Sequence, residues 1–164
     1  MIDTLFLTQS PLFRNLDEPE RAQILMIGRV RSVIAGEVIF REGDPGDGLF
    51  IVLSGSVRIS KRSVTGEEAL AILEAPAYFG EMALIDLGAR AADAIANEPS
   101  DLFFVPLGAL QALIEAEHGI ALKLLSALCE VLAQRLRETN ERYMSVFTIA
   151  QWGGANPAGP SPLP

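Results

Sequence analysis

Two charged residues interrupt an otherwise apolar stretch of the chain, residues 79–95, which reads FGEMALIDLGARAADAI. Glu81 and Arg90 lie nine positions apart, and small residues surround both of them. Arg90 offers the planar fork of N–H donors that matches phosphate oxygens. Glu81 offers carboxylate oxygens that accept hydrogen bonds from hydroxyl groups, as on a sugar. One ligand with an anion beside a diol, a ribose phosphate, would satisfy both charges together.

The backbone around these two charges is suited to the same task. Gly80 precedes a predicted short helical turn, and free N–H groups at such a turn form an anion site. Ala89, Ala91 and Ala92 leave room for a ligand to approach the backbone. The structural alternative is a buried Glu81–Arg90 salt bridge with no ligand, and the residue types alone favour it. Buried ion pairs are poor stabilisers, however, which weakens that alternative.

The composition limits the class of protein. With 164 residues, 49% of them hydrophobic and 21% charged, the chain fits one globular domain. Its net charge of −8 argues against broad contact with nucleic acid. Cys129 and His118 are each the single residue of their type, so we expect no metal site, no cofactor and no catalytic histidine. No secretion signal or membrane span is visible, and we expect a cytoplasmic protein that is not an enzyme.

Three regions of the chain differ in the spacing of their apolar residues and turn signals. Residues 1–29 are predicted to be helical, with Asp17 as an N-cap and Gly28 as a stop. Residues 30–106 carry short β-branched runs between turn signals, which predicts an antiparallel roll or sandwich of about eight strands. The helical period returns over residues 107–143.

Within that last region we predict a short helix over residues 108–116 and a long one from Gly119. The long helix carries apolar and small residues that alternate by three and four: Leu122, Leu125, Cys129, Leu132, Leu136, Thr139, Tyr143, Val146 and Ala150. Such a stripe is typical of a seam between two helices, and it predicts a homodimer through residues 122–150. The alternative is an amphipathic helix that lies on its own domain.

Two motifs together resemble the cyclic nucleotide-binding domain family. FGEMAL followed by RAA resembles the phosphate-binding cassette of that family, and FREGDPGDGLFIVLSGSVRI (residues 40–59) is similar to its strand-and-turn signature. The resemblance implies an eight-stranded antiparallel β-roll with flanking helices and a long C-terminal helix. It therefore predicts a cyclic nucleotide-binding domain over residues 1–143, followed by a helix end and a Gly/Pro-rich tail over residues 144–164.

The resemblance also implies roles for individual residues. The glutamate that matches Glu81 accepts from the ribose 2′-hydroxyl, and the arginine that matches Arg90 pairs with the cyclic phosphate. Two polar residues of the long helix meet the purine, and the alternative for Thr139 is a polar position that fixes the register of the seam. The implied ligand-binding set is Gly80, Glu81, Met82, Ala83, Arg90, Ala91, Ala92, Asp93, Thr139 and Asn140.

Two positions depart from the family pattern. Ala89 stands where a proline is usual, and Asp93 stands where many members carry threonine or serine. A carboxylate beside a cyclic phosphate lowers affinity if both groups stay charged. Asp93 could instead point away from the ligand, or accept from the N1 and N2 donors of guanine. We expect cyclic AMP as the preferred ligand, while Asp93 leaves cyclic GMP open.

The bacterial regulators of this family continue into a DNA-binding winged helix-turn-helix. The 21 residues after Tyr143 leave no space for one, so we expect a stand-alone receptor. Binding would change the packing of its long helix and signal to an unidentified protein effector, without contact to nucleic acid or membrane. The alternative is a protein–protein interaction module that kept the fold but no longer binds nucleotide.

Overall fold

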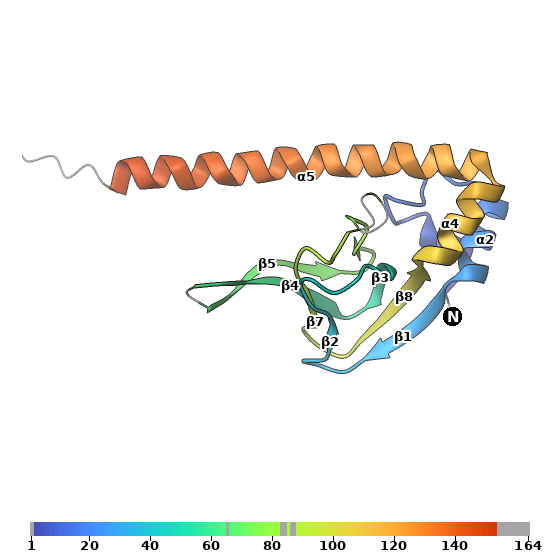
Figure 1. The fold of residues 1–164 in the computed structure, drawn as a ribbon, viewed down its shortest axis with the longest axis horizontal. Coiled ribbons are helices and arrows are strands. Elements are labelled where there is room, and N and C mark those ends of the chain that lie inside the picture. Colours follow the sequence, from blue (N-terminus) through green and yellow to red (C-terminus); the bar gives the residue numbers. More distant parts are fainter. Residues whose placement is uncertain (1, 65, 83–84, 86–87, 154–164) are drawn as a thin grey trace, which may run out of the picture. The chain divides into compact units, whose positions relative to one another are not determined.

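The computed structural model of this chain describes residues 2–64, 66–82, 85 and 88–153. Helices come first, strands follow and helices end the chain, as the sequence predicts (Figure 1). The helices are α1 (Thr4–Leu7), α2 (Glu18–Ile27), α4 (Leu107–Ala116) and α5 (His118–Gly153). The strands are β1 (Arg29–Val33), β2 (Val38–Phe40), β3 (Gly48–Ser54), β4 (Ser56–Ser63), β5 (Gly66–Glu74), β6 (Tyr78–Phe79), β7 (Asp93–Ala96) and β8 (Ser100–Pro106).

The strands form two four-stranded antiparallel sheets, in the orders β1-β8-β3-β6 and β2-β7-β4-β5. Non-consecutive strands are neighbours in both sheets, which is the arrangement of a roll rather than of a simple meander. Apolar side chains from both sheets meet in one core: Val33, Ile39, Phe50, Val52, Val57, Phe79, Ala94, Ala96, Leu102 and Phe104. The predicted eight-stranded antiparallel β-roll with a long C-terminal helix is confirmed.

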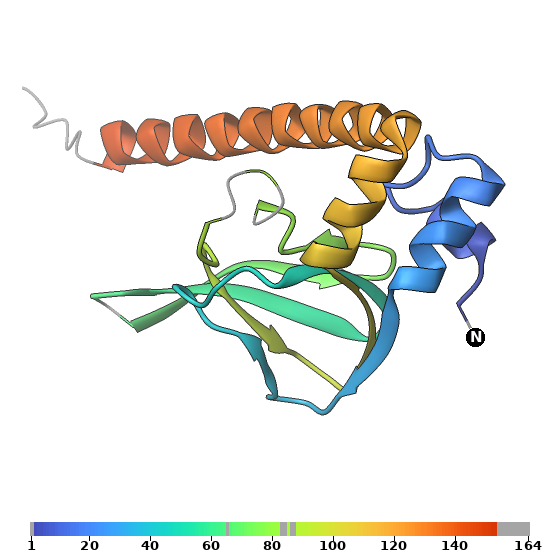
Figure 2. The same ribbon diagram turned by 45° about the vertical axis from the view of Figure 1, so that its right-hand side comes forward.

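The central strands of the first sheet are buried on both faces. β3 and β8 face the core of the roll on one side, and α2 and α4 cover the other side (Figure 2). Gly28 ends α2 directly against the ring of Phe103, where any side chain at position 28 would collide with that ring. The predicted stop at Gly28 is therefore also the point at which the helix docks onto the sheet.

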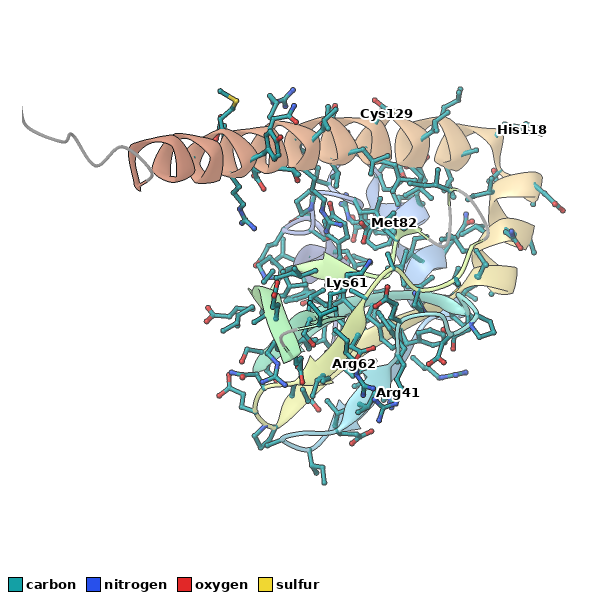
Figure 3. The ribbon with its side chains drawn as sticks, turned by 60° about the vertical axis from the view of Figure 1, so that its left-hand side comes forward. Arg41, Lys61, Arg62, Met82, His118 and Cys129 are labelled. Carbon is teal, nitrogen blue, oxygen red and sulfur yellow. The ribbon has the colours of Figure 1, made fainter. Side chains whose placement is uncertain are left out.

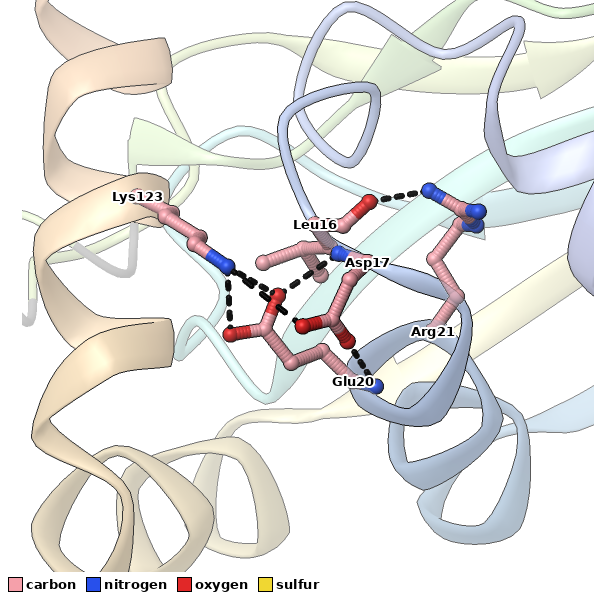
Figure 4. A network of polar contacts seen from close by, with 5 residues as sticks. All are labelled: Leu16, Asp17, Glu20, Arg21 and Lys123. Carbon is pink, nitrogen blue, oxygen red and sulfur yellow. Dashed lines mark hydrogen bonds and ion pairs between the residues drawn. The ribbon is translucent and has the colours of Figure 1, made fainter.

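The start of α2 is fixed by a capping box, as the sequence around Asp17 predicts. The Asp17 carboxylate accepts from the Glu20 N–H at 2.9 Å, and the Glu20 carboxylate accepts from the Asp17 N–H at 2.7 Å. Lys123 of α5 donates to both carboxylate oxygens of Glu20, at 2.7 and 2.6 Å (Figure 4). Lys123 also lies 3.8 Å from Asp17. One ammonium group thus joins the first turns of α5 to the N-terminus of α2.

The chain forms two compact units, residues 1–127 and 128–164, and α5 belongs to both. In the first unit Ile120, Leu124 and Ala127 are buried, whereas Leu122 and Leu125 of the predicted seam are exposed. The face of α5 that packs within the first unit is therefore not the seam. The helix begins at His118, one residue before the predicted Gly119.

In the second unit the seam is exposed as far as its side chains are described. Leu132, Leu136 and Tyr143 are all exposed, and Cys129 is an exposed free thiol. The side chains of Val146 and Ala150 lie outside the described ones.

We predict that Lys123→Met lowers the stability of the folded chain near neutral pH. The hydrogen bonds that Lys123 donates to the Glu20 carboxylate raise the pKa of Lys123 above its ordinary value of 10.5. A raised lysine pKa means that this stabilisation is fully present below the unfolded pKa and is lost as pH rises through the folded pKa. The difference between wild type and Lys123→Met in urea unfolding should therefore shrink above about pH 10.5.

Lys61→Met provides a matched control for that prediction. Lys61 forms an ion pair with Glu42 at 3.0 Å, and both of these side chains are more exposed than those of the Lys123–Glu20 pair. A more exposed pair contributes less. Equal losses of stability in the two variants would show that the Lys123 contact does not tie α5 to α2.

Candidate functional site

The stretch with the two charges crosses from one sheet to the other. The chain leaves β6 at Phe79 and enters β7 of the opposite sheet at Asp93. Gly80 opens the connection with a positive φ of 79°, a conformation that glycine adopts without strain. Glu81 follows and is 1% exposed, so it is not a solvated surface charge. Met82, in helical conformation, is half exposed.

Arg90 is a buried cation, with a side chain that is 2% exposed. Its Nη1 donates to the Gly80 carbonyl at 3.0 Å, and its Nη2 donates to Oδ1 of Asp47 at 2.5 Å. Its Nε has no hydrogen-bond partner in the part of the chain that the structure describes. The ion pair found for Arg90 is therefore with Asp47, from the turn before β3, and the sequence alternative had proposed Glu81 for that role.

The close approach of Arg90 to Gly80 depends on the absence of a side chain at position 80. A Cβ added there would lie 2.5 Å from Nη1 of Arg90 and 3.3 Å from the Gly48 carbonyl oxygen. Glycine at this position thus serves two purposes, the positive φ and the space for the guanidinium.

The backbone around Arg90 is held by the turn that precedes β3. The Arg90 N–H donates to the Asp44 carbonyl at 2.8 Å, and the Gly43 N–H donates to the Arg90 carbonyl at 2.9 Å. An isolated antiparallel bridge joins Ala89 to Pro45. These backbone contacts therefore join the two sequence motifs, residues 40–59 and the phosphate-binding cassette, directly to each other.

The burial of the Arg90–Asp47 pair is strongly asymmetric. The arginine is 2% exposed, whereas the Asp47 side chain is 69% exposed. A buried cation needs anionic or polar partners. An exposed carboxylate contributes a weak ion pair, because water can solvate it when the pair opens. Chemically, the arrangement is a buried two-pronged donor with an exchangeable anion, which is what a receptor for an anionic group requires.

Asp93, the residue that departs from the family pattern, interacts with other groups of the protein. It is 5% exposed, and its Oδ1 accepts from the Glu42 N–H at 2.6 Å. Its Oδ2 lies 3.9 Å from Nε of Arg62, which lies on the surface of the roll with Lys61 and Arg41 (Figure 3). Among the interpretations left open by the sequence, these contacts favour a carboxylate that is directed to the protein backbone.

The remaining predicted site residues lie in different surroundings. Ala91 is exposed and Ala92 half-buried, in the connection that leads into β7. Ala83 lies outside the described residues. Thr139 and Asn140 are exposed on α5, in the second unit, while all the other described site residues belong to the first.

Sequence reasoning missed Asp47 as the partner of Arg90. The residue was visible as the last acid of the turn Asp44-Pro45-Gly46-Asp47, but the turn was interpreted for its geometry alone. Asp47 and Arg90 are 43 positions apart, so only the fold brings them together.

Other kinds of site find no support in the described residues. They contain no group of three or more His, Cys, Asp or Glu side chains that could hold a metal ion. None of the helices within them has the length and apolar character that crossing a membrane needs.

Comparison with known proteins finds similarity over most of the chain. The sequence model described as "Cyclic nucleotide-binding domain" matches residues 30–117. The Cyclic AMP receptor protein of Thermus thermophilus is 37% identical over 132 residues, which cover 80% of this chain and 59% of that protein. A cAMP-dependent protein kinase regulatory subunit from Mycosarcoma maydis is 31% identical, over 88% of this chain and 27% of its own length.

A solved structure shows the same fold. The crystal structure of the Thermus thermophilus Catabolite Activator Protein superimposes with a TM-score of 0.72 at 34% identity, over 83% of this chain and 62% of that one. The chain spans 59% or less of the two curated relatives named above, so each of them has a large part without a counterpart in this sequence.

We predict that Gly80→Ala destabilises the fold more than Gly36→Ala does. Both glycines have a φ near +80°, so either alanine should cost about 1–2 kcal/mol for the left-handed conformation. A Cβ at Gly36 meets no atom within 4 Å, whereas at Gly80 it meets Arg90. We expect roughly 1–3 kcal/mol more for that overpacking, measured by urea unfolding. Equal losses would mean that Arg90 does not lie against Gly80.

Proposed function

This chain belongs to the cyclic nucleotide-binding domain family, and we propose that it is a receptor for a cyclic nucleotide, with cyclic AMP preferred. The receptor couples occupancy to the packing of α5 and signals to a separate protein effector. It is a cytoplasmic homodimer that carries out no catalysis, needs no cofactor and contacts neither nucleic acid nor membrane. The net charge of −8 supports the absence of nucleic acid contact.

The single observation that carries this proposal is the environment of Arg90. Its guanidinium is buried, and its Nη2 contacts Asp47, whose own side chain is mostly in water. A cyclic phosphate would offer the same fork an anion with two in-plane oxygens, which a single carboxylate oxygen at 2.5 Å does not. Exchange of a solvated carboxylate for a phosphate therefore requires little rearrangement of the buried cation.

Glu81 supports a sugar beside that phosphate. Its carboxylate is buried next to Gly80, the residue whose carbonyl accepts from Arg90. A carboxylate oxygen can accept more than one hydrogen bond, and the ribose 2′-hydroxyl is a donor suited to it. In this proposal Gly80, Met82, Ala83, Ala91 and Ala92 supply the backbone around the phosphate.

The nucleotide preference rests on Asp93 and on the long helix. Asp93 accepts from the Glu42 N–H and lies near Arg62, so its negative charge is partly balanced within the protein. A carboxylate that already accepts from the backbone has less acceptor capacity for the donors of guanine, which supports cyclic AMP over cyclic GMP. In the proposed receptor Thr139 and Asn140 meet the purine.

The exposed seam of α5 supports a dimer. Near the start of the helix the buried face is formed by Ile120, Leu124 and Ala127, while Leu122 and Leu125 are exposed. The seam is therefore not used by the first unit, and a stripe of leucines in water favours a second copy of the same stripe as its partner.

The second candidate is a protein–protein interaction module of the same fold that no longer binds nucleotide. Asp93 favours it, because many members of the family carry threonine or serine at that position. The two candidates differ in one measurable property, the affinity for cyclic nucleotide, which the Arg90 variants test.

We predict that Arg90→Ala weakens binding of cyclic AMP by about 2–5 kcal/mol, which is roughly thirtyfold to several thousandfold. Arg90→Lys should recover only part, because an ammonium group cannot make the two-pronged contact. Isothermal titration calorimetry measures both. Arg58→Lys is the control, since Arg58 also pairs with a carboxylate, Glu67 at 2.8 Å, but is more exposed than Arg90 and lies outside the proposed site. Arg90 variants that bind like wild type would place the anion site elsewhere.

We predict that the chain sediments as a dimer and that Leu136→Glu converts it to a monomer. The substitution places a carboxylate at an exposed seam position in each chain, and two such charges face each other across the seam. Gln134→Glu adds the same charge two residues away, off the seam, and should leave the dimer intact. A monomeric wild type in sedimentation velocity would refute this part of the proposal.

Leu136→Glu and Gln134→Glu also test whether nucleotide binding is coupled to dimerisation. If binding and dimer geometry are linked, Leu136→Glu should also weaken the affinity for cyclic AMP, although Arg90 and Glu81 are unchanged. Full affinity in a monomeric Leu136→Glu chain would leave an isolated binding site without the proposed coupling.

A further inference from the structure

The guanidinium of Arg90 lies over an aromatic ring. Its central carbon is 4.1 Å from the ring centroid of Phe40 and 5.8 Å from that of Phe50. We propose that Phe40 is a positioning residue for Arg90: its ring holds the guanidinium plane in the orientation that accepts the phosphate, and so sets the affinity for nucleotide. This inference rests on the proposed function, and it adds a residue that contacts no ligand itself.

Phe40 is held rigidly enough to act in this way. It ends β2 in one sheet, whereas the rings around it come from the other sheet. The centroids of Phe40 and Phe50 are 5.9 Å apart, and those of Phe40 and Phe79 are 5.8 Å apart. Phe50 is stacked on Phe79 at 5.1 Å and also contacts Phe104 at 4.7 Å. The ring under Arg90 is thus one of four that lock together across the core.

The hydrogen bonds of Arg90 leave one motion that the ring restricts. Nη1 is held by Gly80 and Nη2 by Asp47, and these two points define an axis along the edge of the guanidinium. Because Nε has no partner among the described residues, no third hydrogen bond prevents the plane from tilting about that axis. A ring at 4.1 Å from the central carbon blocks the tilt on one side and attracts the cation through its π face.

Burial makes this contact stronger than an ordinary surface cation–π pair. The Arg90 side chain is 2% exposed, so water does not compete with the ring for the cation. A desolvated contact of this kind is at the upper end of the known range. The ring also lies against the charge without adding an anion, so Asp47 remains the carboxylate that a phosphate would replace.

The affinity for nucleotide depends on the fraction of molecules in which the guanidinium has an orientation that fits the phosphate. If the guanidinium samples orientations that do not fit the phosphate, the apparent dissociation constant rises by the inverse of the competent fraction. We therefore expect Phe40→Leu, which has no π face, to weaken cyclic AMP binding by about tenfold, and by no more than about thirtyfold.

The experiment compares that variant with a matched loss in the same core. Phe104→Leu also removes one ring from the aromatic cluster, but Phe104 lies under Arg29, at 4.8 Å, and has no described contact with Arg90. Cyclic AMP binding to the full chain is measured by calorimetry, and urea unfolding reports the stability of each variant. Phe104→Leu should lose stability while its affinity stays within about twofold of wild type.

A second series separates the charge effect of the ring from its shape. Phenylalanine analogues with one, two and three ring fluorines are incorporated at position 40; they keep the packing volume nearly constant but withdraw electron density from the π face. The logarithm of the dissociation constant should rise steadily with fluorination, by about threefold in total at three fluorines. This series keeps the proposal testable even if Phe40→Leu does not fold.

The outcomes are distinguishable. A graded fluorine series together with a normal Phe104→Leu supports the role of Phe40. Two results overturn that role and leave the receptor function intact. The first is an equal affinity for cyclic AMP in the wild type and in every fluorinated variant. The second is a loss of affinity in Phe104→Leu as large as that in Phe40→Leu. A wild type that binds no cyclic nucleotide overturns the proposed function, and this inference with it.

Discussion

A single buried cation sets the requirements that the surrounding structure meets. Arg90 is almost fully buried, so the protein rather than water must supply the polar partners of its guanidinium. Its two terminal nitrogens contact the Gly80 carbonyl and Asp47, and its central carbon lies 4.1 Å from the ring centroid of Phe40. The turn before β3 fixes its backbone through Gly43 and Asp44. The glycine at position 80, the turn of the first motif and the aromatic core can all be understood as adaptations to one charge.

That charge lies where the two sheets are joined. The connection from β6 to β7 passes from one sheet to the other, and β2 and β3, which carry the supporting rings Phe40 and Phe50, also belong to different sheets. A change in Arg90 therefore acts on both sheets. On the other side of the first sheet, α2 and α4 contact β8, and Lys123 links α2 to the first turns of α5. The first unit thus holds the start of the long helix by packing and by the ion pairs of Lys123 with Glu20 and Asp17.

Much of this could be predicted from the sequence, and the rest depends on contacts that no local pattern encodes. Turn residues and β-branched runs predicted the β-roll, and Asp17 and Gly28 predicted the bounds of α2, because these signals act through neighbouring residues. Arg90 and Glu81 were proposed as ligand-binding residues from their types and from the family resemblance. Asp47 was not recognised as the partner, since the fold alone brings positions 47 and 90 together. The same holds for the ring of Phe40 and for the Glu42 N–H that engages Asp93.

The central claim is that the buried Arg90 fork receives the phosphate of a cyclic nucleotide. The most direct measurement is the nitrogen-15 NMR signal of the Arg90 Nε–H group, assigned by its loss in Arg90→Lys, during titration of the full chain with cyclic AMP. We expect this signal to shift and to saturate at one nucleotide per chain, because the phosphate would alter the electrostatics of a group that has no hydrogen-bond partner among the described residues. An unchanged Arg90 signal at saturating cyclic AMP would contradict the account.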